Sequence, residues 1–479
     1  MLAFFTILIA LFGVGCVLWA VLVQRDVFHP LAILMPMVLY LYVYLPYELI
    51  SAGFLSQIPF TAEQLALAQG INLLCILALG GGCIWMNRGR RGNRRGLEGR
   101  VGALPVRMPE SGLSLSALLA TLQTRITLRR LYRLAIVLGS LSSVAFVLNV
   151  NNVGGLFEAY SVEKGGGTAE SGYQRDVVFW AIPAIAILAY CGANDGIRRR
   201  YVVPGLIFAA PLLIHGLLGA RRGPTFMIIA TLAISWFLAR GRRPSPALYL
   251  GGSAALGLLL LAIVTFREQF RIGSQLMTST GEAIDGMLEQ YDENRLSSME
   301  RTLGGNEWVY GTNVMLTFAE RDDFFWGTRL LTILFIRPIP RQLWETKYED
   351  VGMERYLVNV GLGNADENLM WTSYGAAPGF VGDLFAEFSW GAILASWLVG
   401  AAYGRAWRAA VEGAGLGLIL YILLVAVSLF FVMQTLESFL YRMLFTSVPV
   451  LIGWKLLAAR VPQLPLTVGS GLTARQRVA

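Results

Sequence analysis

The sequence has few charged residues and almost none of the side chains that bind metals. Charged residues make up 15% of its 479 residues, whereas a soluble protein carries roughly 25%. Only two histidines, His29 and His215, are present, and none of the four cysteines has the CxxC spacing of a metal or redox site. P-loop, GxGxxG, HExxH and GxSxG motifs are also missing. We therefore expect no metal, no cofactor, no disulfide and no nucleotide-driven reaction.

The chain consists instead of a series of long apolar runs. Hydrophobic residues make up 55% of it, and its mean hydropathy is +0.57. A helix needs about 20 mostly apolar residues to cross a bilayer. The sequence predicts an all-α polytopic membrane protein with about eleven transmembrane helices, in the ranges 2–23, 31–50, 65–86, 131–150, 176–193, 201–219, 223–239, 246–265, 378–403, 413–433 and 443–459. No basic stretch precedes the first range, so we interpret it as a retained span rather than a cleaved signal peptide.

Clusters of arginine between these runs predict the orientation. The stretch 87–133 contains eleven arginines and two glutamates, and basic loops of this kind stay in the cytoplasm. With that stretch inside, the N-terminus lies outside, and all but one of the other short basic clusters are cytoplasmic. The net charge of +8 therefore reflects orientation rather than nucleic-acid binding, because the clusters lack interleaved aromatic residues. We expect a multi-pass protein of a bacterial cytoplasmic (inner) membrane.

This orientation divides the chain into parts with different surroundings. The apolar stretch 324–336 is short and contains Arg329, so we interpret it as a re-entrant or interfacial helix, with a complete span as the alternative. The parts are N-terminal transmembrane helices 1–86, a basic cytoplasmic loop 87–130, central transmembrane helices 131–265, a large periplasmic loop 266–377, C-terminal transmembrane helices 378–459 and a cytoplasmic tail 460–479.

Arg221 and Arg222 are the exception to the charge pattern, because they fall on the outer side between two expected spans. An arginine deep in a bilayer costs roughly 2.5–3.5 kcal/mol on insertion scales. The pair indicates either an anion site that faces the outer compartment or guanidinium groups that snorkel or pair with a loop carboxylate. His215, shortly before them, is either a packing residue or a catalytic one. Glu437 and Arg442 bracket another external loop and add a candidate base and a candidate cation.

A further group of cations lies in the large loop. Arg337, Arg341 and Lys347 fall within eleven residues that also contain Pro338 and Pro340, and prolines fix backbone dihedrals. Cations on a stiff backbone suit a pyrophosphate or an acidic sugar, and arginine offers paired donors to phosphate oxygens. The alternative is a solvated basic turn between amphipathic helices.

Two carboxylates fall within an expected span. Asp383 and Glu387 are four residues apart, so they share one face of a helix in the outer half of the membrane. Carboxylates at that depth usually face a cavity or a partner. They would either form ion pairs with Arg221, Arg222 or Arg442, or provide a base toward a sugar hydroxyl.

The order of these features resembles the Wzy-type oligosaccharide repeat unit polymerases, which make O-antigen and exopolysaccharide. Arg221–Gly223 begins a middle span and precedes a large outer loop that bears the element PRQLWETK (340–347). The helix GFVGDLFAEFSWGAI (379–393) resembles a family pattern that reads GE-x-Y…FG, with Asp383 in place of the acid. The likeness covers roughly residues 200–450, and its motifs are loose.

This resemblance implies a metal-independent membrane glycosyltransferase with a fold similar to the GT-C class. It implies transfer of a growing glycan from undecaprenyl pyrophosphate onto a lipid-linked repeat unit, outside the cytoplasm and without a nucleotide sugar. The expected partners are undecaprenyl-pyrophosphate-linked oligosaccharides, membrane lipid, a chain-length regulator and a flippase. The candidate bases are Glu387, Asp383, Glu437 and His215. The candidate pyrophosphate ligands are Arg221, Arg222, Arg337, Arg341, Lys347 and Arg442.

Two other functions stay open on the sequence alone. An O-antigen ligase is also a membrane glycosyltransferase with a large outer loop. A lipid-linked sugar flippase or other transporter belongs to a different class, and is disfavoured by the large charged loop and by the lack of internal sequence repeats.

Overall fold

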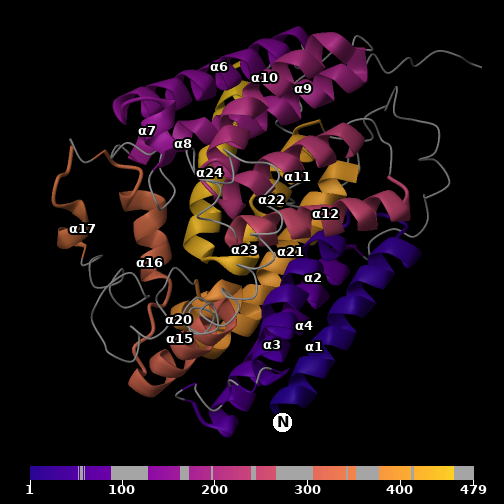
Figure 1. Cartoon of the computed structure of the whole chain (residues 1–479), viewed down its shortest axis with the longest axis vertical. Helices are drawn as coiled ribbons and strands as arrows, with labels where there is room; N and C mark the ends of the chain where they lie inside the picture. The colour runs from indigo at the N-terminus through magenta and orange to yellow at the C-terminus, as the bar shows by residue number, and fades with distance from the viewer. Residues whose placement is uncertain are drawn as a thin grey trace, which may run out of the picture.

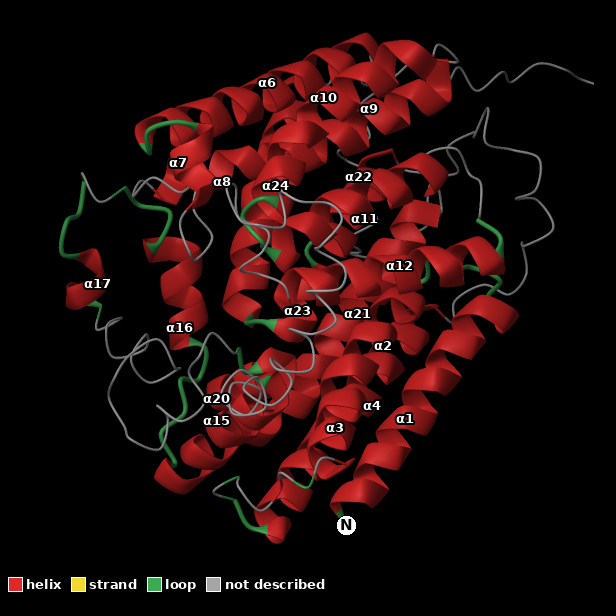
Figure 2. Ribbon diagram, viewed as in Figure 1, coloured by secondary structure: helices red, strands yellow, loops and turns green. Residues whose placement is uncertain are grey.

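The structure is a computed structural model that describes residues 1–51, 53, 55, 58, 60–87, 128–161, 172–195, 198–238, 244–265, 306–340, 343–351, 377–411 and 415–457. All regular structure in these ranges is helical (Figure 2). The elements are α1 (Leu2–Leu18), η1 (Trp19–Val23), α2 (Pro30–Leu39), η2 (Tyr40–Tyr44), α3 (Leu45–Ser51), α4 (Ala62–Asn87), α6 (Leu128–Asn152), α7 (Leu156–Ser161), α8 (Gly172–Val177), η5 (Val178–Trp180), α9 (Ala181–Asp195), α10 (Arg198–Leu217), α11 (Arg222–Leu238), α12 (Pro246–Thr265), α15 (Glu307–Arg321), α16 (Thr328–Leu331), η6 (Thr332–Ile336), α17 (Lys347–Asp350), α20 (Gly379–Phe388), η8 (Ser389–Gly391), α21 (Ala392–Val411), α22 (Gly415–Ala426), α23 (Ser428–Met433) and α24 (Leu436–Leu457).

Nine helical stretches in the described residues are long and apolar enough to cross a membrane, which supports a polytopic membrane protein. They coincide with nine of the eleven expected ranges, although one runs to Val411 and the last begins at Leu436. The other two ranges are also helical. However, α11 has 17 residues, and the apolar part of α12 covers only Ala247–Leu260. The count of eleven therefore stays a prediction.

The stretch 324–336 does not form a complete span. Its helix, Thr328–Ile336, combines α16 with the π-helical turn η6. Nine residues at about 1.5 Å each reach roughly 13 Å, against about 30 Å of hydrocarbon. Most of the large loop expected at 266–377 lies outside the described residues, as do nearly all of the basic loop 87–130 and the tail 460–479.

The short helices of the loops collect on one side of the helix bundle. Figure 1 places α7, α8, α16 and α17 along its left edge, and α15 and α20 at the lower left. The start of α1 lies on the same lower side, in agreement with the expected sidedness of the N-terminus relative to the large loop (Figure 1). The loop segment and the ends of the spanning helices can therefore build a common site.

The segment 306–340 docks on the bundle through a buried polar network. Trp308 of α15 donates from Nε1 to the Gln69 side-chain oxygen of α4 at 2.8 Å. The Gln69 amide nitrogen donates in turn to Thr6 Oγ1 at 3.1 Å and to the Tyr42 carbonyl at 2.8 Å. Buried polar groups are costly unless they are hydrogen-bonded. These bonds therefore fix α15 against α1, η2 and α4.

Glycines allow a close contact between the helices α4 and α21. A Cβ atom on Gly82 would lie 2.2 Å from the Trp397 carbonyl oxygen, and one on Gly400 would lie 2.0 Å from the Leu79 carbonyl oxygen. Small residues let membrane helices approach at backbone distance. The neighbouring Gly81 has no such atom within 4 Å. Only one of the two adjacent glycines is therefore required by packing.

This difference gives a matched test. We expect Gly82→Ala to destabilise the protein by roughly 1–3 kcal/mol, because the backbone of α21 must move away. Gly81→Ala removes a flexible residue from a helix at an open position, and should be neutral or stabilising by up to about 1 kcal/mol. The midpoint of thermal unfolding of each purified variant in detergent measures the effect. Equal midpoints for the two variants would contradict the packing described here.

Candidate functional site

Five arginines from separate parts of the chain approach one another on the side where the loop helices lie. We call them the arginine cluster: Arg175 of α8, Arg221 and Arg222 at the start of α11, Arg337 after η6, and Arg442 of α24. Four of the six cations predicted from the sequence belong to it. The contacts below establish the grouping.

The turn between α10 and α11 positions Arg221 and Arg222. Arg221 N–H donates to the Gly216 carbonyl at 2.8 Å and Ala220 N–H to that of Leu217 at 3.1 Å, which is the Schellman pattern that ends a helix. Ala220 has a φ of 46°, a left-handed conformation that glycine usually adopts. The two arginines therefore sit at a tight corner between two helices. Arg222 forms an ion pair with Glu307, the first residue of α15.

Arg442 is held by aromatic rings rather than by a carboxylate. Its guanidinium lies 4.0 Å from the ring centre of Phe430 and 5.8 Å from that of Phe179. Nη1 donates to the Ser438 carbonyl at 3.1 Å, while Nε has no hydrogen-bond partner among the described residues. A Cβ on Gly223 would lie 2.5 Å from Phe430, so the start of α11 adjoins this ring. Arg442 therefore lies close to the Arg221–Arg222 corner.

Arg337 joins the loop segment to the start of α24. Its Nη1 lies 2.7 Å from Glu437 Oε1, with 30% and 18% of the two side chains exposed. Its guanidinium lies 4.1 Å from the ring centre of Tyr441, whose hydroxyl donates to Asp176 Oδ2 at 2.6 Å. Asp176 follows Arg175 directly. One chain of contacts therefore runs from η6 through α24 to α8.

His215 lies at the edge of the arginine cluster, beside Arg175. Its Nδ1 is 3.2 Å from the Tyr160 hydroxyl. Burial raises the pKa of Tyr160 to about 12, although the charge of Arg221 acts in the opposite direction. The phenol therefore stays protonated and can donate to His215. A small cavity is lined by both His215 and Arg175, together with Phe146, Asn149, Val178 and Phe179.

The described part of the site combines five guanidinium groups with three carboxylates, which are those of Asp176, Glu307 and Glu437. Arginine presents several N–H donors in a fixed plane that matches phosphate oxygens. The arrangement is chemically suited to an anion with many oxygens. Within the same ranges, no three His, Cys, Asp or Glu side chains gather as metal ligands.

Asp383 and Glu387 point toward a different partner from those expected. Both carboxylates bind Arg329, which lies 2.5 Å from each through Nη2 and Nε respectively. The three side chains are 0–3% exposed, and we call them the buried triad. Asp383 also accepts from Leu436 N–H at 2.7 Å, and Glu387 from Gly327 N–H at 3.1 Å. The structural alternative therefore describes these carboxylates, with Arg329 in place of Arg221, Arg222 or Arg442.

The electrostatics of Arg329 follow from this enclosure. Burial by itself would lower its pKa, but the two carboxylates outweigh that effect and raise it. The guanidinium therefore stays charged. Its removal would leave two carboxylates in a dry site.

Lys347 binds backbone carbonyls at the end of η6. It is 1% exposed, and its ammonium donates to the carbonyls of Ile336, Arg337 and Ile339. Such bonds satisfy the free carbonyls at a helix C-terminus. Lys347 thus closes the end of the helix that carries Arg329. Arg341 lies outside the described residues.

Sequence reasoning missed several members of this region. Arg175 stands directly before an apolar run, on the side that the sequence predicts to be outside, which is the same conflict with the orientation rule that identified Arg221 and Arg222. Arg329 was noted only as an obstacle to a span. The roles of Glu307 and Tyr441 depend on tertiary contacts, and no local signal in the sequence indicates them.

The buried triad gives a stability test. Arg329→Met should destabilise the protein by roughly 3–5 kcal/mol, because it leaves two buried carboxylates uncompensated. The triple variant Arg329→Met, Asp383→Asn, Glu387→Gln removes all three charges and should recover most of that loss. Arg321→Met, at an exposed arginine of α15, is the control. The yield of monodisperse protein and its unfolding midpoint measure the effect; an unaltered R329M protein would exclude the buried ion pairs.

Neither protein-family models, nor curated proteins, nor solved structures gave any match to this chain. No relative therefore supplies a reaction or a substrate. What the site does has to be inferred from its residues, their charges and their position relative to the membrane.

Proposed function

We propose that this protein is a membrane glycosyltransferase that polymerises oligosaccharide repeat units linked to a lipid diphosphate. The observation that carries the proposal is the arginine cluster. Guanidinium groups from α8, α11, η6 and α24 lie together beside the helices of the outer loop, and Arg442 has no carboxylate bound to it among the described residues. A buried guanidinium without a carboxylate beside it is costly at the edge of a bilayer unless it serves a ligand.

The chemistry requires little beyond these groups. An acceptor sugar hydroxyl attacks the anomeric carbon of the donor glycan, a new C–O bond forms, and the bond to the diphosphate oxygen breaks. The electron pair of that bond leaves with the diphosphate, and the hydroxyl proton passes to a base. Because the donor is already activated, the protein needs to position the two substrates and stabilise the leaving anion. Arg221, Arg222, Arg337 and Arg442 supply that stabilisation.

Glu437 is the most suitable base among the four predicted candidates. It is partly exposed, and within the described residues one of its oxygens accepts a hydrogen bond, from Arg337. Asp383 and Glu387 are buried, and both oxygens of each are occupied. His215 is buried and bound to Tyr160. We therefore assign proton acceptance to Glu437 and a positioning role to the buried triad.

The resemblance to Wzy-type polymerases adds support from the sequence. Its motif residues Arg221 and Arg222 belong to the arginine cluster. Its motif residue Asp383 accepts a hydrogen bond from Leu436, which directly precedes Glu437. On this proposal the enzyme acts at the outer face of a bacterial cytoplasmic membrane, with the undecaprenyl chain of both substrates in the bilayer. A chain-length regulator and a flippase are its expected partners, and the GT-C-like fold and the eleven spans belong to the same proposal.

Deletion of the gene separates the candidate functions. Loss of a polymerase should leave single repeat units on the lipid carrier or on the surface. Loss of a ligase should leave long polymer on the carrier, and loss of a flippase should trap single repeats inside. The purified protein should lengthen a lipid-linked repeat unit in detergent without nucleotide sugar. Unchanged long chains in the deletion strain would remove the proposal.

Substitutions of Arg442 test the anion contact. Arg442→Gln should lower the polymerisation rate by roughly 10²–10³-fold, the usual cost of one donor lost from a site of developing charge. Arg442→Lys keeps the charge but loses the planar donors, so it should recover only part of the rate. The exposed Arg321→Gln is the control. Equal rates for R442Q and R321Q, at equal amounts of protein in the membrane, would contradict the assignment.

Glu437→Gln tests the base. A positioned general base contributes roughly 10²–10⁴-fold, so the variant should lose activity by that factor while it still binds the lipid diphosphate. Glu349→Gln, at an exposed carboxylate of α17, should behave like the native protein. Single-turnover rates with a lipid-linked repeat unit measure the chemical step apart from binding. A full rate for E437Q would assign the proton to another group.

A further inference from the structure

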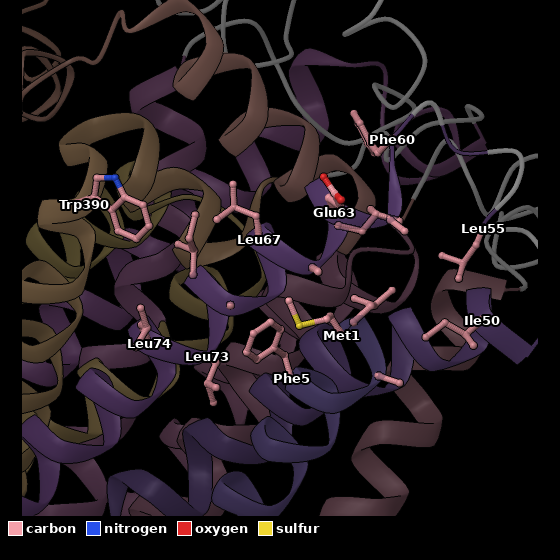
Figure 3. Close-up of a pocket in the computed structure, with 17 residues that line it drawn as sticks. Met1, Phe5, Ile50, Leu55, Phe60, Glu63, Leu67, Leu73, Leu74 and Trp390 are labelled. Atoms are coloured by element: carbon pink, nitrogen blue, oxygen red, sulfur yellow. The ribbon is translucent and has the colours of Figure 1, made fainter.

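A large apolar cavity opens on the side of the protein where the loop helices lie, away from the arginine cluster. It has a volume of about 1030 Å³ and lies between the start of α1, the end of α3 and the first half of α4. Met1, Phe5 and Ile50 line it from the first two segments and Leu67 and Leu74 from the third, with Trp390 at one edge (Figure 3).

One charged side chain lines the cavity, and it is acidic. Glu63, in the first turn of α4, is exposed at the rim (Figure 3). A capping box between Thr61 and Gln64 fixes this turn, with mutual hydrogen bonds of 2.9 and 3.2 Å. No lysine or arginine occurs in residues 1–24 or 49–87, which contain every lining residue except Trp390. Among the described residues, the charged groups of the lining are therefore the Glu63 carboxylate and the Met1 α-amino group, and no lysine or arginine belongs to it.

The depth of the cavity matches one leaflet of a bilayer. Leu74 lies eleven residues after Glu63 on α4, so the lining extends roughly 16 Å along the helix at about 1.5 Å per residue. The hydrocarbon core is about 30 Å thick, and one leaflet is half of it. The apolar walls thus span the length of an acyl chain from the rim to the bilayer centre.

We propose that this cavity is a binding site for a phospholipid with an ammonium headgroup, such as phosphatidylethanolamine. The acyl chains fill the apolar walls, and the ammonium approaches the Glu63 carboxylate. A lipid diphosphate is disfavoured here, because its head carries no cation that could pair with the Glu63 carboxylate. The proposal does not depend on glycan transfer, because it concerns a different site and a different charged residue, Glu63.

The headgroup preference tests it directly. The full-length protein is purified in mild detergent from membranes that contain both phosphatidylethanolamine and phosphatidylglycerol, and the retained lipids are identified by native mass spectrometry. We expect phosphatidylethanolamine to be enriched roughly two- to fivefold over its share in the membrane, the ratio that an exposed ion pair supports. Glu63→Gln should remove the enrichment and Glu63→Lys should reverse it. Glu320→Gln, at an exposed carboxylate of α15, should leave it unchanged.

A second pair of variants tests the cavity itself. Gly70 lines the cavity, and a Cβ there would meet only Phe5, at 3.7 Å. Gly70→Trp should therefore fill the space and release the lipid. Gly81→Trp, on the same helix and outside the lining, should retain it. A native protein without bound phospholipid, or with no headgroup preference, would overturn the proposal. So would a folded G70W protein that keeps its lipid.

Discussion

A charge in a layer of low dielectric is costly unless an opposite charge lies beside it, and three such pairings organise the side of this protein where the loop helices lie. Arg222 binds Glu307, Arg337 binds Glu437, and the buried triad joins the loop helix to α20. In each case one partner belongs to the segment 306–340 and the other to the helix bundle. The pairings therefore determine where the loop segment lies. The arginine cluster can form because this segment is held in place.

The buried triad connects this architecture to the proposed chemistry. Asp383 accepts a hydrogen bond from Leu436 N–H, so it fixes the residue directly before Glu437. Arg329 stands at the start of the nine-residue helix that ends beside Arg337. The positions of Arg337 and Glu437 thus both depend on the buried triad. Buried charges of this kind contribute little net stability, and geometric specificity is the better explanation for them here.

The sequence predicted the spanning helices well and the ion pairs only in part. Apolar runs predict a span because the hydropathy of each residue indicates whether it lies in lipid or in water. Nine expected ranges therefore match helices that can cross a membrane. The spacing of Asp383 and Glu387 likewise predicted a shared face that needs a partner. Their partner Arg329 lies 54 and 58 positions away in the chain, and no periodicity connects residues at that distance. Lys347 shows the converse limit, because a cation near prolines suits a helix terminus as well as an anion site, and its ammonium binds three backbone carbonyls.

The two proposals assign different charges to two regions on the side of the protein where the loop helices lie. The arginine cluster gathers five guanidinium groups, whereas the lining of the apolar cavity includes Glu63 and, among the described residues, no lysine or arginine. Coulomb attraction sorts amphipathic molecules by their heads even when their tails are alike. On the two proposals, an anionic lipid diphosphate is drawn to the first region and a lipid with an ammonium head to the second. The charge pattern would then keep membrane phospholipid from competing with a lipid-linked substrate.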